Sequence, residues 1–262
     1  MVLDGSGSIT DSSWNIMKQG LANAIRDPNT FPHDGSVELT VIQFGVNEYC
    51  ARVEVGPIVV NSNNYQSVAN QISGMIQGKG WTPIAAGLYL AADTLANSNN
   101  LANSNNFGGF NTNNRQIINL VTDGNPNVVS EPGEMCGDRN DGDAAGKISA
   151  ENARYYLLNK LSMTEDQDEL DVVAVFGDPS PDVEWLKNEM CWPEPGVTQW
   201  PPTKPGWVHY VQSWQEFVDS IDEQFDILFR RIDNRAELID SKYMDPYQKN
   251  DKLTVSIYPT TQ

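Results

Sequence analysis

The stretch that decides the fold of this chain is MVLDGSGSIT, residues 1–10. Three oxygen-bearing side chains, Asp4, Ser6 and Ser8, stand at alternate positions with glycines between them, directly after a short apolar run. An apolar run of this kind is typical of a buried strand, and the glycines permit a tight turn after it. Small oxygen ligands gathered at one turn predict a binding site for a hard cation.

The composition narrows the classes of protein to which the chain can belong. It has 262 residues, 39% of them hydrophobic, and no apolar run of the length that a membrane-spanning helix needs. With 17 basic and 35 acidic residues, its net charge of −18 repels polyphosphate and argues against nucleic-acid binding. The acidity is explained either by solubility in salty surroundings or by carboxylates that hold divalent cations.

The cysteines leave the redox state open. Cys50, Cys136 and Cys191 permit three alternative single disulfides, and the sequence does not choose among them. The absence of CxxC spacing, together with only two histidines, argues against a zinc site. The given chain has no signal peptide, and its first residues resemble the end of a strand whose beginning is absent.

Short apolar runs alternate with amphipathic stretches, which predicts an α/β protein with a mostly parallel sheet flanked by helices. Segment 50–60 is expected to be the hairpin partner of segment 36–45. The other strands are expected at 115–124, 170–177 and 206–211, and the main helices at 12–27, 64–77, 82–96, 146–161 and 213–232.

Three insertions interrupt this pattern. The hexapeptide LANSNN occurs at 95–100 and again at 101–106, and its polar composition predicts a surface loop. Segment 125–145 is acidic. Segment 192–206 is rich in proline and tryptophan, which favours either a stiff connector whose aromatic rings cap the core or a surface for a partner.

The sequence becomes polar and irregular after residue 232, so we expect one domain over 1–232 and a C-terminal extension over 233–262. The extension contains KLTVSIYP (252–259), which has the alternation of a single isolated strand. Such a strand could add to the edge of this sheet, pair with a neighbouring copy, or begin a further domain.

Two further residues are expected to join the first turn. Ligands of doubly wound sheets bind at the carboxyl ends of the strands. Asp123 stands at the end of the buried strand expected within 115–124. Thr82 precedes Pro83 and is expected to cap the helix that follows. With Asp4, Ser6 and Ser8, they form an all-oxygen set that suits Mg²⁺, with Mn²⁺ or Ca²⁺ as alternatives.

The order of DGSGS, Thr82 in GWTPIAAGL and Asp123 in LVTDG resembles the von Willebrand factor type A (vWA) family, over roughly residues 1–232. In that family the constellation is called the metal-ion-dependent adhesion site (MIDAS). The resemblance implies a doubly wound, Rossmann-like fold with six strands, mostly parallel, and one antiparallel edge strand, which suits segment 50–60. It also implies that the first strand is truncated at its start here.

The resemblance assigns roles to individual residues. Ser6 and Ser8 would bind the metal through their hydroxyls, Asp4 and Asp123 directly or through water, and Thr82 according to the conformational state. The family's usual activity is metal-mediated protein binding rather than catalysis. The partner would present an Asp or Glu carboxylate to the cation, and the family habit, with the acidity, implies a secreted or cell-surface protein.

Two features beside this set allow two interpretations each. Trp81, next to Thr82, either packs against the helix or contacts the ligand. The acidic stretch 138–143 is either a solvated loop or a second, Ca²⁺-type site, although it departs from the EF-hand pattern. The oxygen-bearing residues of that stretch are Asp138, Asn140, Asp141 and Asp143.

Two functions follow from these patterns. The first is a non-enzymatic adhesion or protein-binding module that uses the cation to capture a partner's carboxylate. The alternative is a structural subunit of a filament or surface layer, in which the domain is scaffold and segment 252–259 pairs with a neighbouring copy. A serine-dependent enzyme is disfavoured, because His33 and His209 stand in no motif that would supply a base to Ser6 or Ser8.

Overall fold

A computed structural model describes residues 1–46, 50–98, 114–133, 140–177 and 180–242, with side chains as far as residue 229. Its strands are β1 (Val2–Asp4), β2 (Asp34–Val46), β3 (Cys50–Asn61), β4 (Ile117–Thr122), β5 (Glu169–Val175) and β6 (Val208–Val211). Its helices are α1 (Asp11–Arg26), α2 (Tyr65–Ser73), α3 (Ile84–Ser98), α4 (Asp143–Lys160), α5 (Val183–Trp185), a π-helical turn η2 (Leu186–Met190) and α6 (Trp214–Lys242).

The six strands form one sheet in the order β3-β2-β1-β4-β5-β6. All neighbouring pairs are parallel except β2 and β3, which are antiparallel at the edge. The order reverses at β1, which is the arrangement of a doubly wound fold. The predicted fold class is therefore confirmed, including the antiparallel edge strand.

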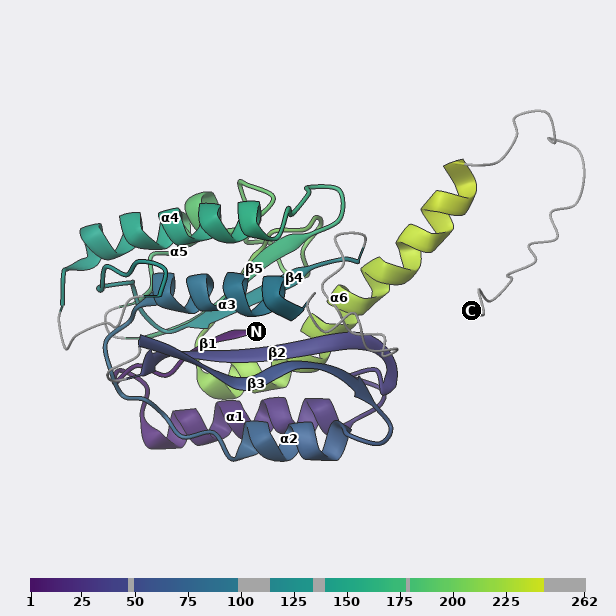
Figure 1. Ribbon diagram of the computed structural model, residues 1–262, viewed down its shortest axis with the longest axis horizontal. Helices are drawn as coiled ribbons and strands as arrows, with labels where there is room; N and C mark the ends of the chain where they lie inside the picture. The colour runs from purple at the N-terminus through teal and green to yellow at the C-terminus, as the bar shows by residue number, and fades with distance from the viewer. Residues whose placement is uncertain (47–49, 99–113, 134–139, 178–179, 243–262) are drawn as a thin grey trace, which may run out of the picture.

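Helices cover both faces of the sheet, with α3 and α4 on one face and α1, α2 and α6 on the other (Figure 1). Helix α1 illustrates why the sequence folds this way. The Thr10 side chain accepts a hydrogen bond from the Ser13 N–H at 3.2 Å and caps the helix. Trp14, Met17 and Leu21 then recur at helical spacing, and all three are buried against the sheet.

Strand β1 lies in the middle of the sheet and sets the position of the site. Val2 lies opposite Ile42 of β2 and Leu120 of β4. Because β1 and β4 are parallel neighbours, their carboxyl ends meet at one edge of the sheet. This register brings the turn after Asp4 beside Asp123.

Two helices end later than the sequence pattern predicts. Helix α6 continues ten residues past position 232, to Lys242. Helix α3 begins and ends two residues later than the predicted 82–96, so residues 97 and 98 of the first LANSNN copy are helical and the prediction of a loop was wrong for them. Leu95 and Ala96 still pack against the core there, which explains the extension. The rest of the repeat and segment 252–259 lie outside the described residues.

The proline- and tryptophan-rich segment 192–206 packs against the body. The Trp200 ring lies 5.2 Å from that of the buried Trp207 and 3.7 Å from that of His209, measured between centroids. These contacts favour the interpretation of a connector whose aromatic rings cap the core. Cys50 is disulfide-bonded, whereas Cys191 is a free, buried thiol. Within the described ranges, no helix is long and apolar enough to cross a membrane.

Candidate metal centre

The turn after β1 brings three of the predicted residues onto a fourth from a distant part of the chain. The Ser6 N–H donates to Asp4 Oδ1 at 2.8 Å, and the Ser6 and Ser8 hydroxyls are hydrogen-bonded at 2.9 Å. The Ser8 hydroxyl donates to Asp123 Oδ1 at 2.8 Å. One connected set of oxygen atoms therefore contains Asp4, Ser6, Ser8 and Asp123.

Thr122 completes this set and was missed by the sequence analysis. Its hydroxyl donates to Asp4 Oδ2 at 2.8 Å, so both oxygens of the buried Asp4 carboxylate accept a hydrogen bond. A threonine at the end of an otherwise apolar strand, directly before Asp123, is the signal that could have identified it. Thr122 ties β1 to β4 at the point where both strands end.

Thr82 lies in the wall of the same cavity, but it does not cap α3. Its N–H donates to Asn127 Oδ1 at 2.9 Å, and its carbonyl accepts from the Asn127 N–H at 3.2 Å. Helix α3 begins at Ile84, with a bond from the Gly87 N–H to the Pro83 carbonyl. The cap prediction was therefore wrong, because Asn127 holds Thr82 outside the helix.

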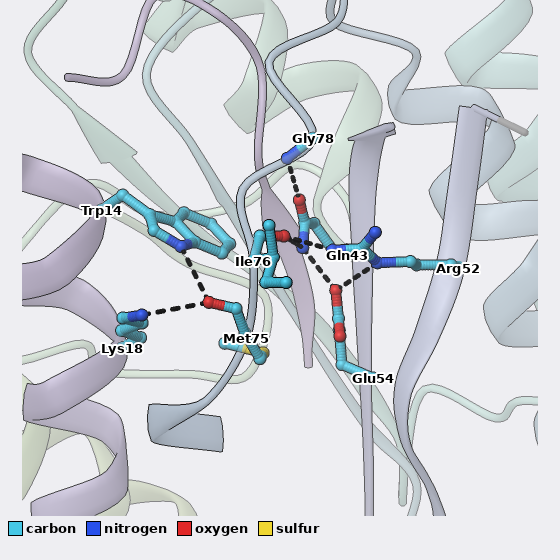
Figure 2. Close-up of polar contacts among 8 residues, drawn as sticks. All are labelled: Trp14, Lys18, Gln43, Arg52, Glu54, Met75, Ile76 and Gly78. Atoms are coloured by element: carbon cyan, nitrogen blue, oxygen red, sulfur yellow. Dashed lines mark hydrogen bonds and ion pairs between the residues drawn. The ribbon is translucent and has the colours of Figure 1, made fainter. Parts of the chain in front are cut away.

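The segment that leads to Thr82 is fixed by a buried amide, as Figure 2 shows. Gln43 Oε1 accepts from the Gly78 N–H at 2.7 Å, and Gln43 Nε2 donates to the Ile76 carbonyl at 2.9 Å and to Glu54. Arg52 donates to Glu54 at 2.6 Å and also to the Ile76 carbonyl. These bonds from β2 and β3 hold the segment in one conformation.

Helix α1 holds the beginning of the same segment. Trp14 Nε1 and Lys18 Nζ both donate to the Met75 carbonyl, at 3.4 and 3.1 Å (Figure 2). The turn itself needs glycine at Gly5, because a Cβ there would stand 2.2 Å from Gln43 Oε1. The Gly5 carbonyl also accepts from the Lys79 N–H at 2.8 Å, which joins the turn to the segment.

The two carboxylates of the centre are electrostatically unfavourable by themselves. Burial raises the pKa of Asp4, against the effect of its hydrogen bonds from Ser6 and Thr122. Burial, and then the charge of Asp4, raises the pKa of Asp123 to about 7. Within the described part of the chain, no basic side chain forms an ion pair with either carboxylate, and the nearby Lys79 pairs with Asp11 at 2.6 Å. A bound cation would relieve this repulsion.

These oxygens open onto a cavity of about 430 Å³. Trp81 lines its rim with 42% of its surface exposed. The backbone at the end of β5 also passes close by, since a Cβ on Gly177 would stand 2.1 Å from the Asp123 carbonyl oxygen. Phe176, the preceding residue, is 53% exposed. The centre is thus accessible and has aromatic surface beside it.

The described residues of the acidic stretch 138–143 form hydrogen bonds to the backbone and begin a helix. Asp141 Oδ2 accepts from the Val129 N–H at 2.8 Å, and Asn140 Oδ1 accepts from the Gly142 N–H at 2.8 Å. Asp143 begins α4 and lines the same cavity as Thr82. Asp138 lies outside the described residues. Among those described, no group of three His, Cys, Asp or Glu side chains is placed to hold an ion.

The family model for the von Willebrand factor type A domain matches residues 1–166, well over half of the chain. The chain belongs to this family. No curated protein matches the sequence significantly. The matched range contains the three elements that carry the resemblance: DGSGS, Thr82 and Asp123.

Solved structures of similar shape share little sequence with this vWA chain. Proximal thread matrix protein 1 from the mussel byssus is 17% identical over 87% of this chain and 46% of its own, with a TM-score of 0.56. The pilus adhesin SpaC from Lactobacillus rhamnosus GG is 15% identical over 88% and 30%, with a TM-score of 0.49. Manganese-loaded TRAP protein from Plasmodium vivax is 19% identical over 86% and 70%, with a TM-score of 0.45. The chain therefore spans less than half of the mussel protein, and that likeness concerns the fold alone.

Proposed function

We propose that this vWA domain is a non-enzymatic, metal-dependent adhesion or protein-binding module. A divalent cation would be held by Asp4, Ser6, Ser8, Thr82 and Asp123, and it would bind a carboxylate of a protein partner. The observation that carries the proposal is the pair of buried carboxylates of Asp4 and Asp123, joined through Ser6 and Ser8, with no ion-pairing base among the described residues. Ser6, Ser8 and Asp123 line the cavity.

The donor set fits a hard cation. Carboxylates and hydroxyls are ligands that Mg²⁺, Mn²⁺ and Ca²⁺ accept, and a compact site that retains water favours Mg²⁺. When bound there, a cation would supply a positive charge next to Asp4 and Asp123 and would accept an acidic group from outside as a ligand. Residues of the chain orient the two carboxylates: Thr122 donates to Asp4, and Ser8 donates to Asp123.

The rim supports an expectation about the chemistry of the partner. Trp81, which lines the cavity, offers exposed aromatic surface beside the proposed cation site. We expect a partner segment in which an Asp or Glu side chain stands next to apolar groups, because the acid alone would leave this aromatic surface in water.

The same geometry gives no support to an enzyme. Both histidines are engaged elsewhere: His33 Nε2 lies 2.7 Å from the Ile25 carbonyl oxygen, and His209 packs on Trp200. The serine hydroxyls of the centre are hydrogen-bonded to each other and to Asp123, without a neighbouring base in the described residues. Location outside the cell is favoured by the disulfide at Cys50, since disulfides persist in oxidising compartments.

Isothermal titration calorimetry with Mn²⁺ and Mg²⁺ tests the proposal. We expect wild type to bind both ions, and Asp4→Ala and Ser8→Ala to bind at least about 10-fold more weakly, because removing such ligands removes charge-assisted contacts. Ser8 is exposed, so Ser8→Ala is expected to fold even where Asp4→Ala does not. Asp219→Ala, an exposed acid on α6, is the control. Equal heats from all four proteins would reject the site.

A further inference from the structure

A second, larger cavity of about 630 Å³ lies at the opposite edge of the sheet, where β1 begins. Strand β2 starts at Asp34, eight residues before Ile42, the partner of Val2. Strand β4 starts at Ile117, three residues before Leu120, the other partner of Val2. In the part of the chain that the structure describes, no strand lies between these two overhanging segments, which therefore border a slot in the plane of the sheet.

The slot has the walls of a strand-binding site. Val37 and Leu39 of β2 face it from one side, and Ile117 and Ile118 of β4 face it from the other. Leu95 of α3 also lines it. Phe225, Leu228 and Phe229 of α6 line it as well, so helices from both faces of the sheet border the space as they border β1.

Two polar side chains in these walls, those of Thr40 and Asn119, have no hydrogen-bond partner among the described residues. Thr40 Oγ1 and both side-chain heteroatoms of Asn119 form no hydrogen bond within the described part of the chain, and each residue is only 6% exposed. A buried polar group without a partner destabilises the fold, because it has lost its hydrogen bonds to water. Orphaned groups in both walls point to a polar occupant, and a peptide backbone flanked by small hydroxyl side chains satisfies that requirement.

We propose that residues 252–259 of the same chain, KLTVSIYP, occupy this slot as a strand parallel to β2 and β4. Leu253, Val255 and Ile257 alternate with Thr254 and Ser256. The apolar set suits the aliphatic and aromatic walls, and the hydroxyl set suits the orphaned groups. The added strand continues β1 toward its amino end and fills the gap between β2 and β4.

The connection is long enough and arrives from the correct side. Helix α6 follows β6 from the metal-centre edge and reaches the slot at Phe229, and its last part projects beyond the body (Figure 1). The 13 residues from there to Lys242 span about 20 Å. Residues 243–251 reach up to roughly 30 Å when extended, so the chain can return. A segment that enters from this side runs toward Met1, in the direction of β1.

Hydrogen–deuterium exchange on the full-length chain tests the proposal. We expect the amides of 253–258 to exchange at least about 100-fold more slowly than an unstructured peptide, because they would be bonded within a sheet. The double variant Val255→Pro with Ile257→Pro should lose this protection and speed exchange at 36–40 about 10-fold or more, since proline cannot donate to a ladder. Gln248→Pro, in the connecting segment, is the matched control and should behave as wild type.

Wild-type exchange alone decides the matter if the double variant fails to fold. Unprotected amides over 253–258 in wild type would overturn the proposal, as would unchanged exchange at 36–40 in a folded double variant. Sedimentation identifies the donor of the strand: a monomer with full protection supports the same chain. A dimer that loses protection on dilution would overturn that assignment in favour of a second copy.

The metal centre is at the other edge of the sheet, so Mn²⁺ calorimetry on the same variants keeps the two proposals separate.

Discussion

Replacing Asp123 with Asn should make the metal-free protein more stable. In the absence of a cation, the carboxylate of Asp123 is buried beside that of Asp4, and its pKa is raised from 3.8 to about 7. An acid with a raised pKa binds its proton more tightly in the folded state, so its ionisation destabilises the fold. This destabilisation begins near pH 3.8, grows as the pH rises, and is complete above about pH 7.

The magnitude follows from the size of the shift. At about 1.4 kcal/mol for each pKa unit, a shift of roughly three units costs roughly 4 kcal/mol at pH 8. Asn keeps an oxygen that can accept the bond from Ser8, but its amide group needs a partner, which costs about 1 kcal/mol. We therefore expect Asp123→Asn to raise the free energy of unfolding by about 3 kcal/mol at pH 8, and by less than about 1 kcal/mol at pH 5.

Urea denaturation followed by tryptophan fluorescence, in EDTA at both pH values, measures this difference. Mg²⁺ added at about 100 times its dissociation constant should then stabilise wild type by about 2.7 kcal/mol and leave the variant unchanged. Asp219→Asn controls for the general effect of removing one negative charge. A variant that is as stable as wild type, or less stable, at pH 8 in EDTA would refute the view that the two carboxylates destabilise each other without a cation.

Three further changes test the surroundings of the centre and the core. Gln43→Leu should lower the free energy of unfolding by about 2–4 kcal/mol in urea denaturation and weaken Mn²⁺ binding, because it leaves the Gly78 N–H without its partner. Gly5→Ala should cost about 1–3 kcal/mol in the same assay, since the new methyl group would displace the Gln43 side chain. Burial lowers the pKa of His209, so its ring protons should titrate below pH 6.5 in NMR spectra. Protonation of this buried ring destabilises wild type as the pH falls through that range, so His209→Gln should lose less stability over the same range. Titration at or above pH 6.5 would contradict the buried environment.

The sequence predicted the sheet well because its strands carry a strong signal. Strand residues 117–122 and segment 170–177 are apolar over most of their length, as expected for strands buried on both faces. The ends of the helices were harder to predict. Helix α6 passes position 232 into a polar stretch, and no glycine or proline stands between Trp214 and Lys242 to end it. The apolar pattern marks the packed part of a helix rather than its full length.

The predicted ligand positions converge because parallel strands place their carboxyl ends together. The residues that support them were missed for a physical reason. Gln43 is one polar residue in an alternating strand, and only the fold shows that it is fully buried against the segment before Thr82. Asn127 likewise comes from an acidic insertion whose sequence gives no hint of its contact with Thr82. Such contacts join distant parts of the chain, so no local pattern encodes them.

The free thiol of Cys191 can report local opening of the structure that buries it. Cys191 is inaccessible to solvent, its carbonyl accepts a bond from the buried Arg154, and burial raises its pKa well above 9.0. Alkylating reagents attack thiolates, so the native protein should resist them. Gly196 of the segment 192–206 packs directly against the Cys191 sulfur, since a Cβ there would stand 2.7 Å from it. The alkylation rate in dilute reagent would therefore report how often the structure over this thiol opens.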